Sequence, residues 1–145
     1  MSTPLKMQKL AHALHKQGFA RTARTLSRVV RLVFAAYLPP EAQIGEGTEL
    51  GYGGIGVIVH KDAVIGRNCL LSPGVVVGGR SGKEGAPVIE DEVLIGVGAK
   101  ILGPIRIGAG ARIGANAVVL HDVEPGDTVA GVPARSLRAT KRQSA

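Results

Sequence analysis

One histidine and a pair of glycines stand at a spacing that would place a base beside backbone donors. His60 precedes the Gly78-Gly79 pair by eighteen residues. A neutral imidazole can take a proton from a hydroxyl, and exposed N–H groups of Gly78 or Gly79 can hold a carbonyl oxygen or an oxyanion. The pairing therefore suits acyl transfer from a thioester to an alcohol. A histidine at an ordinary surface turn is the alternative.

The other titratable residues are weaker candidates. His12 and His15 fall in an N-terminal helical segment, where solvated or capping roles are favoured. His121 follows the last repeat, where a role in the terminal turn is favoured. Asp62 lies two residues from His60 and is either its orienting carboxylate or a solvated corner residue. No phosphate-binding P-loop or dinucleotide fingerprint is present, and no metal is expected.

A stride of six residues predicts the elements that must position these groups. One aliphatic residue recurs at steps of six or twelve, with one nine-residue step from Leu50 to Val59. The residue two before each member is usually small or β-branched, and the residue after it is often glycine. This period fits neither an α-helix nor a hairpin and is typical of a hexapeptide-repeat β-helix. The series is Ile44, Leu50, Val59, Ile65, Leu71, Val77, Ile89, Ile95, Ile101, Ile107, Ile113 and Val119.

Three hexapeptides are expected to form one triangular coil, with the aliphatic residue of each pointing into the prism. Neighbouring coils then lie about 4.8 Å apart, like strands in a sheet, and glycine supplies corner backbone of positive φ. The sequence thus predicts an all-β fold, a parallel β-helix preceded by a short helical segment. Its four coils stack the columns Ile44/Ile65/Ile89/Ile107, Leu50/Leu71/Ile95/Ile113 and Val59/Val77/Ile101/Val119.

Two insertions interrupt the stride and are expected to project from corners of the prism, where functional loops tend to lie. The first is a three-residue excess within residues 51–56, and the second occupies residues 79–86. We expect Tyr52 in the first, with Arg80 and Ser81 in the second, to form a pocket for the acceptor beside His60.

The chain divides into three parts. Residues 1–40 form a basic amphipathic helical segment, residues 41–135 form the β-helix domain, and residues 136–145 read as a frayed polar tail. Within the second part, the repeats are expected to run from about Glu41 to Val119. Cys69, the single cysteine, excludes a disulfide within the chain and a cysteine-based zinc site, and its repeat position favours a buried packing role.

Two helices are expected in the N-terminal part, over about residues 5–17 and 20–37, with Pro39 and Pro40 ending the second. They are expected to cap the prism or to pack between subunits. Contact with an anionic membrane is the alternative, because a basic amphipathic helix suits such contact.

The net charge of +7 belongs to the ends of the chain. Residues 1–40 carry +7 with no acidic residue, residues 41–133 carry −4, and residues 134–145 carry +4. Such ends could meet nucleic acid, an anionic membrane or an anionic partner. Nucleic acid is not expected, because no aromatic platform interleaves the charges. No signal peptide or membrane-spanning run is recognised, so a cytoplasmic location is expected.

Four segments resemble the serine acetyltransferase branch of the hexapeptide acyltransferases, and together the likeness covers about residues 42–137. They span residues 75–83, 95–103, 113–119 and 130–135. The resemblance implies a left-handed parallel β-helix that assembles as a homotrimer or a dimer of trimers, with acetyl-CoA in the groove between adjacent prisms. It places the thioester carbonyl at Gly78 and Gly79.

The same resemblance implies the residues that hold the rest of acetyl-CoA. The pantetheine arm would run near Gly98, Ala99 and Ala117. The nucleotide phosphates would lie near Lys100 and Arg135.

Three departures from that branch narrow the expected chemistry. The family carries an Asp-His pair in the turn where this chain has Gly51-Tyr52-Gly53-Gly54, and a second histidine where Ala86 precedes Pro87. Its large N-terminal helical domain is reduced here to about forty residues. The chain looks more like the short enzymes associated with surface polysaccharide and sugar acetylation, in which the base corresponds to His60.

We therefore expect an acetyl-CoA-dependent O-acetyltransferase that acts on a small hydroxylated acceptor, either serine or a sugar unit. His60 would deprotonate the acceptor for direct attack on the thioester, while Gly78 and Gly79 steady the oxyanion. A non-catalytic hexapeptide scaffold and a membrane-recruited subunit of a polysaccharide assembly are the alternatives.

Overall fold

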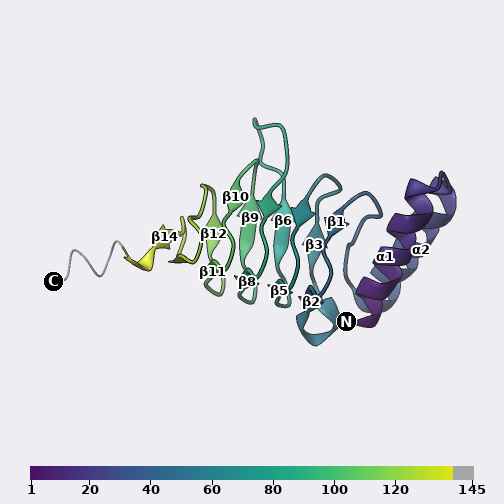
Figure 1. The fold of residues 1–145 in the computed structure, drawn as a ribbon, viewed down its shortest axis with the longest axis horizontal. Helices are drawn as coiled ribbons and strands as arrows, with labels where there is room; N and C mark the ends of the chain where they lie inside the picture. Colours follow the sequence, from purple (N-terminus) through teal and green to yellow (C-terminus); the bar gives the residue numbers. More distant parts are fainter. Residues whose placement is uncertain (139–145) are drawn as a thin grey trace.

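The computed structural model describes residues 1–138; Lys141, Arg142 and the rest of the expected polar tail from residue 139 lie outside the described residues. Two helices, α1 (Thr3–Lys16) and α2 (Ala20–Phe34), lie across one end of a solenoid of short strands (Figure 1). Within the described chain, neither helix has the length and apolarity needed to cross a bilayer.

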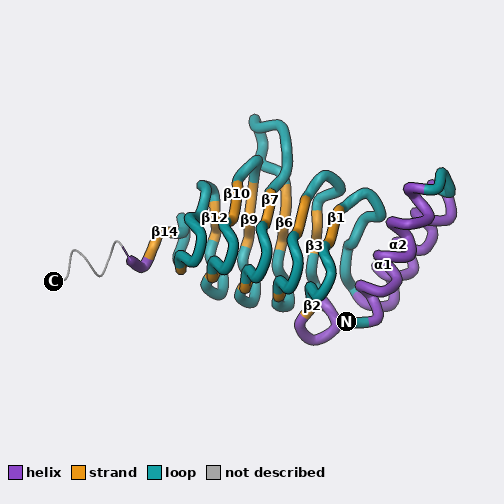
Figure 2. The backbone as a smooth tube through the Cα atoms, in the orientation of Figure 1, coloured by secondary structure: helices purple, strands orange, loops and turns teal. Residues whose placement is uncertain are grey.

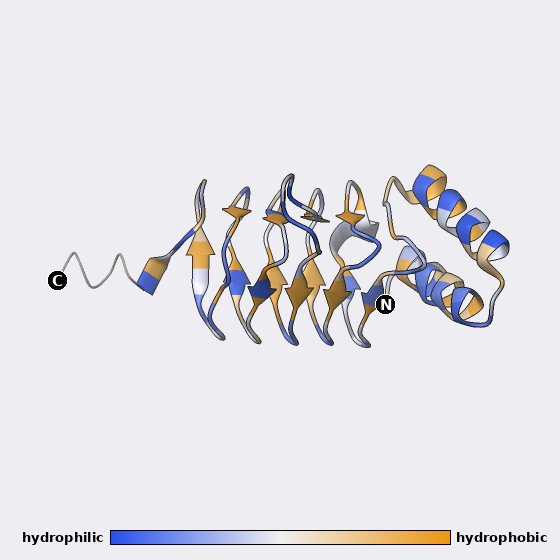
Figure 3. Ribbon diagram, turned by 90° about the horizontal axis from the view of Figure 1, so that it is seen from above, coloured by the Kyte–Doolittle hydropathy of each residue, from blue (hydrophilic) through white to orange (hydrophobic). Residues whose placement is uncertain are grey.

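The helices are fastened to the first coil by buried contacts. The side-chain amide of Gln8 donates to the carbonyls of Pro39 and Ala42, at 3.3 and 3.1 Å. Leu5 and Val30 are fully buried in the same core as the solenoid. Figure 3 shows hydrophilic and hydrophobic residues alternating around both helices, as an amphipathic pair that caps a core requires.

Helix α2 ends earlier than the two prolines predicted. It stops at Phe34, and Ala35 adopts a left-handed conformation with φ of 51°. The chain then joins the solenoid directly, because Tyr37 forms a parallel bridge with Ile58. The expected helix end near Tyr37 is therefore wrong, and the coil begins before Glu41.

Three walls of parallel strands wind around one axis (Figure 2). The first wall contains β1 (Gln43–Ile44), β4 (Val64–Ile65), β7 (Val88–Ile89) and β10 (Arg106–Ile107). The second contains β2 (Glu49–Leu50), β5 (Leu70–Leu71), β8 (Leu94–Ile95), β11 (Arg112–Ile113), β13 (Thr128–Ala130) and the antiparallel β14 (Arg135–Ser136). The third contains β3 (Ile58–Val59), β6 (Val76–Gly78), β9 (Lys100–Leu102) and β12 (Val118–Val119).

The strand register confirms the predicted inward columns. On the third wall, Val77 pairs with both Val59 and Ile101, and the other two walls repeat this alignment. Every member of the series is buried except Ile44, which is half-buried in the first coil. The predicted parallel β-helix with a short helical segment is confirmed, and the coil is consistent with the left-handed form.

The solenoid extends beyond the predicted end at Val119. Val123 forms a parallel bridge with Ile107, and Val129 in β13 pairs with Ile113. Both added residues are buried. A partial further coil therefore covers the C-terminal end of the core.

Several of the glycines after the inward residues are required by close packing, which corrects the expected reason. Gly45 and Gly66 do not have positive φ. A Cβ on Gly45 would lie 2.5 Å from the carbonyl of Gly66, and one on Gly66 would lie 2.6 Å from the carbonyl carbon of Glu90. Left-handed backbone occurs instead later in the turns, as at Gly47 and Gly74. At these corners, each coil contacts the backbone of the next.

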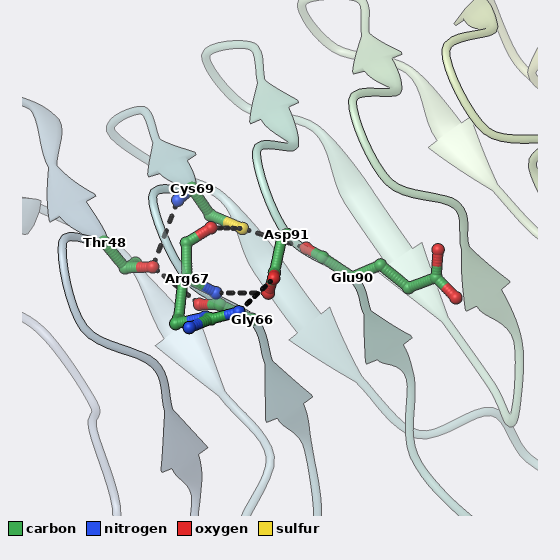
Figure 4. Close-up of polar contacts among 6 residues, drawn as sticks. All are labelled: Thr48, Gly66, Arg67, Cys69, Glu90 and Asp91. Carbon is green, nitrogen blue, oxygen red and sulfur yellow. Dashed lines mark hydrogen bonds and ion pairs between the residues drawn. The ribbon is translucent and has the colours of Figure 1, made fainter.

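A polar network links three successive coils at the corner between the first and second walls (Figure 4). The hydroxyl of buried Thr48 donates to the carbonyl of Gly66 at 2.7 Å and accepts the amide N–H of Cys69 at 3.1 Å. The thiol of Cys69 donates to the carbonyl of Glu90 at 3.1 Å. Burial raises the pKa of this thiol, so it stays protonated and serves packing, as predicted.

Two exposed carboxylates complete the same corner. Asp91 accepts the amide N–H of Arg67 at 2.8 Å, and Glu90 accepts that of Ala109 at 2.7 Å. These backbone hydrogen bonds hold the pKa of both carboxyl groups below the ordinary range. Each acid therefore stays ionised while it caps the turn of a neighbouring coil.

Thr48→Val should destabilise the protein, because it leaves a buried amide and a carbonyl without their shared partner. The expected loss is about 1–3 kcal/mol in the free energy of unfolding. Thr48→Ser keeps the hydroxyl and should lose about 0.8 kcal/mol for the missing methyl. Urea unfolding at matched protein concentration measures both. A valine variant as stable as the serine variant would show that the network does not hold the coils.

Candidate active site

The predicted juxtaposition of His60 with the glycine pair is present. The amide N–H of His60 donates to the carbonyl of Val77 at 2.8 Å, which places it one coil from Gly78. A Cβ built on Gly79 would lie 3.9 Å from Nε2 and Cδ2 of the imidazole. The edge of the ring that carries Nε2 therefore faces Gly79. An adjoining hollow of about 310 Å³ is lined by His60 and Gly78, among others.

The second ring nitrogen of His60 faces Asp62. Nδ1 accepts the backbone N–H of Asp62 at 3.2 Å, and it lies 3.8 Å from the carboxylate Oδ2. The amide contact favours the neutral tautomer with its proton on Nε2. Proton acceptance at Nε2 requires the other tautomer, in which Nδ1–H donates to a carboxylate. Rotation of the exposed Asp62 side chain toward Nδ1 would supply that acceptor.

The two glycines are not equivalent as donors. Gly78 belongs to the ladder between β6 and β9, where it pairs with Leu102 and accepts the N–H of Gly103 at 2.9 Å. Gly79 follows the strand, and within residues 1–138 no backbone acceptor is found for its N–H. Gly79 is therefore free to hold an oxyanion, whereas Gly78 lies within the strand ladder.

The second insertion projects from the solenoid after β6 (Figures 1 and 2). Arg80 bridges Lys83 within this loop. Its side-chain stem lies over Gly103, where an added Cβ would approach Arg80 Cβ to 3.3 Å. Ser81 is exposed. Neither Arg80 nor Ser81 lines the hollow at His60, so the structure places the loop beside this hollow rather than in it.

Tyr52 lies on a different corner from His60 in the same chain. It belongs to the 3-10 turn η1 (Gly51–Gly54), which connects the second wall to the third, whereas His60 connects the third to the first. Figure 1 shows η1 and the loop after β6 on opposite edges of the solenoid. Tyr52 is 87% exposed with φ of 49°. Within one chain, Tyr52 therefore does not reach His60, and its predicted place in the acceptor pocket would require a neighbouring subunit.

Ala99 and Ala117 are core residues. Both are fully buried. The amide of Ala99 donates to the carbonyl of Gly96, and that of Ala117 to the carbonyl of Gly114, at 3.2 Å in both cases. Their side chains lie inside the coil, so a pantetheine arm that runs near them would contact their exposed neighbours. Gly98 has φ of 71° at the neighbouring corner, where a Cβ would overlap the side chain of Asn116.

The two expected phosphate ligands lie apart. Lys100 projects from the third wall, and its ammonium donates to the carbonyls of Gly74 and Gly98. Arg135 lies in β14 at the C-terminal end and is exposed. His60 and Arg135 are separated by roughly four to five strand spacings, about 19–24 Å along the axis.

Sequence reasoning missed Tyr37 and Lys61, which both line the hollow at His60. The six-residue repeat could have revealed Tyr37. Leu38 stands six residues before Ile44, so the repeat already includes the turn that carries Tyr37. Among residues 1–138, no three His, Cys, Asp or Glu side chains are grouped to hold a metal ion.

Comparison with known proteins adds independent information. The family described as "Bacterial transferase hexapeptide (six repeats)" matches residues 86–121. The serine acetyltransferase of Helicobacter pylori strain J99 is 40% identical over 131 residues, which cover 89% of this chain and 76% of that protein. The one from Bacillus licheniformis is 41% identical over 129 residues, and the chain spans 59% of its length.

Solved structures of serine acetyltransferases are also similar to this chain. Soybean serine acetyltransferase complexed with serine is 41% identical with a TM-score of 0.88, over 92% of this chain and 56% of that one. Serine acetyltransferase in complex with coenzyme A from Brucella abortus strain S19 is 39% identical with a TM-score of 0.88, over 92% and 54%. With this fold, and with 40% identity across 76% of the Helicobacter protein, the chain belongs to the serine acetyltransferase family.

Proposed function

We propose that this chain transfers the acetyl group of acetyl-CoA to a hydroxyl of a small acceptor. The observation that carries the proposal is the imidazole of His60 beside the unpaired N–H of Gly79. A base and an oxyanion donor on one corner are the two groups that direct acyl transfer needs. The relatives are named serine acetyltransferases, and structures of two have been solved with serine and with coenzyme A.

The reaction can be written as direct attack. Nε2 of His60 removes the hydroxyl proton while the acceptor oxygen bonds to the thioester carbonyl carbon. The N–H of Gly79 donates to the resulting oxyanion. Collapse of the tetrahedral species breaks the carbon–sulfur bond, and His60 returns its proton to the departing thiolate of CoA. Asp62 would hold the proton on Nδ1 and so keep Nε2 available as the base.

We infer that the complete site lies between subunits of a trimer. Tyr52 and His60 occupy different corners of one prism, and three prisms packed side by side would bring unlike corners together. Tyr52 is held in left-handed backbone with its ring exposed, a costly arrangement that a neighbouring subunit would explain. The acceptor is serine, as the names of the relatives indicate, or a sugar hydroxyl.

His60→Ala should lower acetyl transfer by about 10²–10⁴-fold, the usual contribution of a general base. CoA affinity should hardly change, because the half-exposed ring adds little to the stack. His121→Ala is the matched control, since that histidine is also exposed beside a carboxylate. The wild-type rate should fall on acidification, because a protonated imidazole has no lone pair to offer.

Steady-state release of CoA with serine, with sugars and with sugar phosphates as acceptors measures these rates. Retained activity in His60→Ala, with loss in His121→Ala, would move the base to the C-terminal end. Absence of turnover in the wild-type protein with every acceptor would favour the non-catalytic scaffold.

Mixed trimers should reveal whether Tyr52 and His60 act across a subunit boundary. Trimers of Tyr52→Ala alone and of His60→Ala alone should each be impaired. Refolded mixtures should regain activity, because some interfaces then combine an intact Tyr52 with an intact His60. Native mass spectrometry verifies that mixed trimers have formed. If their activity does not recover, either Tyr52 and His60 act within the same chain or Tyr52 does not belong to the site.

CoA binding should weaken with salt, because Arg135 at the C-terminal end is the exposed cation proposed for its phosphates. Arg135→Ala should weaken binding about tenfold at low ionic strength and flatten the salt dependence. Arg21→Ala, which removes the same charge from the opposite end, should leave the dissociation constant unchanged. Fluorescence competition at two salt concentrations measures the CoA dissociation constant. If both variants bind CoA as wild type does, the CoA phosphates do not lie near Arg135.

A further inference from the structure

A hollow lined by three arginines lies between α2 and the first coil. Arg24, Arg28 and Arg31 line it, and its volume is about 290 Å³. Their spacing of four and three residues puts them on one face of the helix. Among residues 1–138, none of the three forms an ion pair with a carboxylate. Three arginines without a carboxylate partner therefore line one hollow, and the guanidinium of Arg31 lies 6.0 Å from the centre of the Tyr37 ring.

The floor of this arginine hollow carries a polar group without a partner. Ser27 lines it and is only 8% exposed. Its hydroxyl has no hydrogen-bond partner in the described part of the chain. Buried hydroxyls are normally paired, because leaving one unpaired is unfavourable. A helical serine often bonds the carbonyl four residues back, but Ser27 does not. That hydroxyl has almost no accessible surface, so the guanidinium groups, and not Ser27, would contact a ligand in the hollow.

The charge of the arginine hollow fits a phosphate. Glu41 is the one acidic residue in its lining, so three guanidinium groups and one carboxylate give a net charge of +2. A phosphate monoester carries about −1.5 to −2 near neutral pH, whereas a carboxylate would leave positive charge unbalanced. Guanidinium groups also match phosphate oxygens with two parallel hydrogen bonds.

The arginine hollow adjoins the candidate active site. Tyr37 lines both this hollow and the one at His60. The parallel bridge between Tyr37 and Ile58 places Pro39, which also lines the arginine hollow, in register with His60. The two hollows therefore adjoin at Tyr37, with Pro39 one strand spacing, about 4.8 Å, from His60.

We propose that the arginine hollow binds the phosphate group of an acceptor whose hydroxyl is acetylated at His60. The proposal rests on the acyl transfer proposed above and narrows its acceptor to phosphorylated hydroxyl compounds. A phosphate and a hydroxyl separated by the length of a triose or hexose would reach both sites. The same contacts would exclude the neutral form of that acceptor.

Isothermal titration calorimetry of the full chain with glycerol 3-phosphate, and with glycerol as its neutral match, tests the site. Wild type should bind only the phosphate. Arg28→Ala should weaken that binding by about tenfold or more, the effect of losing hydrogen bonds to a charged group. Arg21→Ala removes the same charge from the same helix outside the hollow and should change it less than about twofold. Equal weakening by both variants, or no binding by wild type, would overturn the proposal.

The calorimetry contains no acetyl-CoA, so the two proposals can fail separately. Absence of phosphate binding would not contradict the proposed acyl transfer, and absence of turnover would not contradict a measured phosphate binding. Side-chain ¹⁵N spectra then test the link to His60, whose signals are assigned by their loss in His60→Gln. Glycerol 3-phosphate should shift the imidazole signals of His60 and leave those of His121 in place. Binding without a shift at His60 would show that the hollow does not serve the acceptor.

Vesicle co-sedimentation distinguishes a soluble acceptor from a lipid headgroup as the source of the phosphate. Phosphatidylcholine vesicles containing phosphatidic acid are compared with pure phosphatidylcholine. Sedimentation that disappears in Arg28→Ala identifies lipid phosphate, and calorimetric binding without sedimentation identifies a soluble acceptor. Sedimentation unaffected by Arg28→Ala, together with no calorimetric binding, would overturn the phosphate site.

Discussion

Stacking of backbone on backbone at one strand spacing is the constraint on which this structure depends. At the corner between the first and second walls, the contacts of Gly45 and Gly66 leave no room for a side chain. The inward columns fill the prism with aliphatic residues, where removal of one isoleucine side chain would cost about 2–5 kcal/mol. Because each coil must lie directly on the next, residues far apart in sequence become neighbours at fixed distances. The candidate site is a product of this stacking.

The corners of the prism are where chemistry can be added, because the walls are committed to hydrogen bonding and the interior to packing. His60 occupies the corner after the third wall, and Gly79 begins the one insertion that projects far from the solenoid. The helical cap adds a different property to the same corner. It brings unpaired arginines to a molecule whose remaining coils are acidic. Transfer chemistry and acceptor selection can therefore be supplied by separate parts of the chain.

The sequence was sufficient for the parts of the structure that repeat. The inward columns and the contact between His60 and Gly79 could be predicted from sequence spacing. One regular coil contains eighteen residues, so residues eighteen positions apart lie next to each other on adjacent coils. Ala99 and Ala117 were assigned to CoA although their small side chains are needed inside the core. The last coil was missed because Val129 follows Ile113 by sixteen residues, which breaks the stride. The arginine hollow could not be predicted, since it depends on how α2 docks on the first coil.

A crystal structure of the protein with CoA would test the central claim most directly, because it locates the reacting sulfur. We expect this sulfur beside Nε2 of His60 and the N–H of Gly79, with the nucleotide directed toward Arg135 and Tyr52 of a neighbouring subunit facing the same groove. A sulfur atom located away from this corner, with His60 facing only solvent, would contradict the claim that His60 and Gly79 form the acetyl-transfer site.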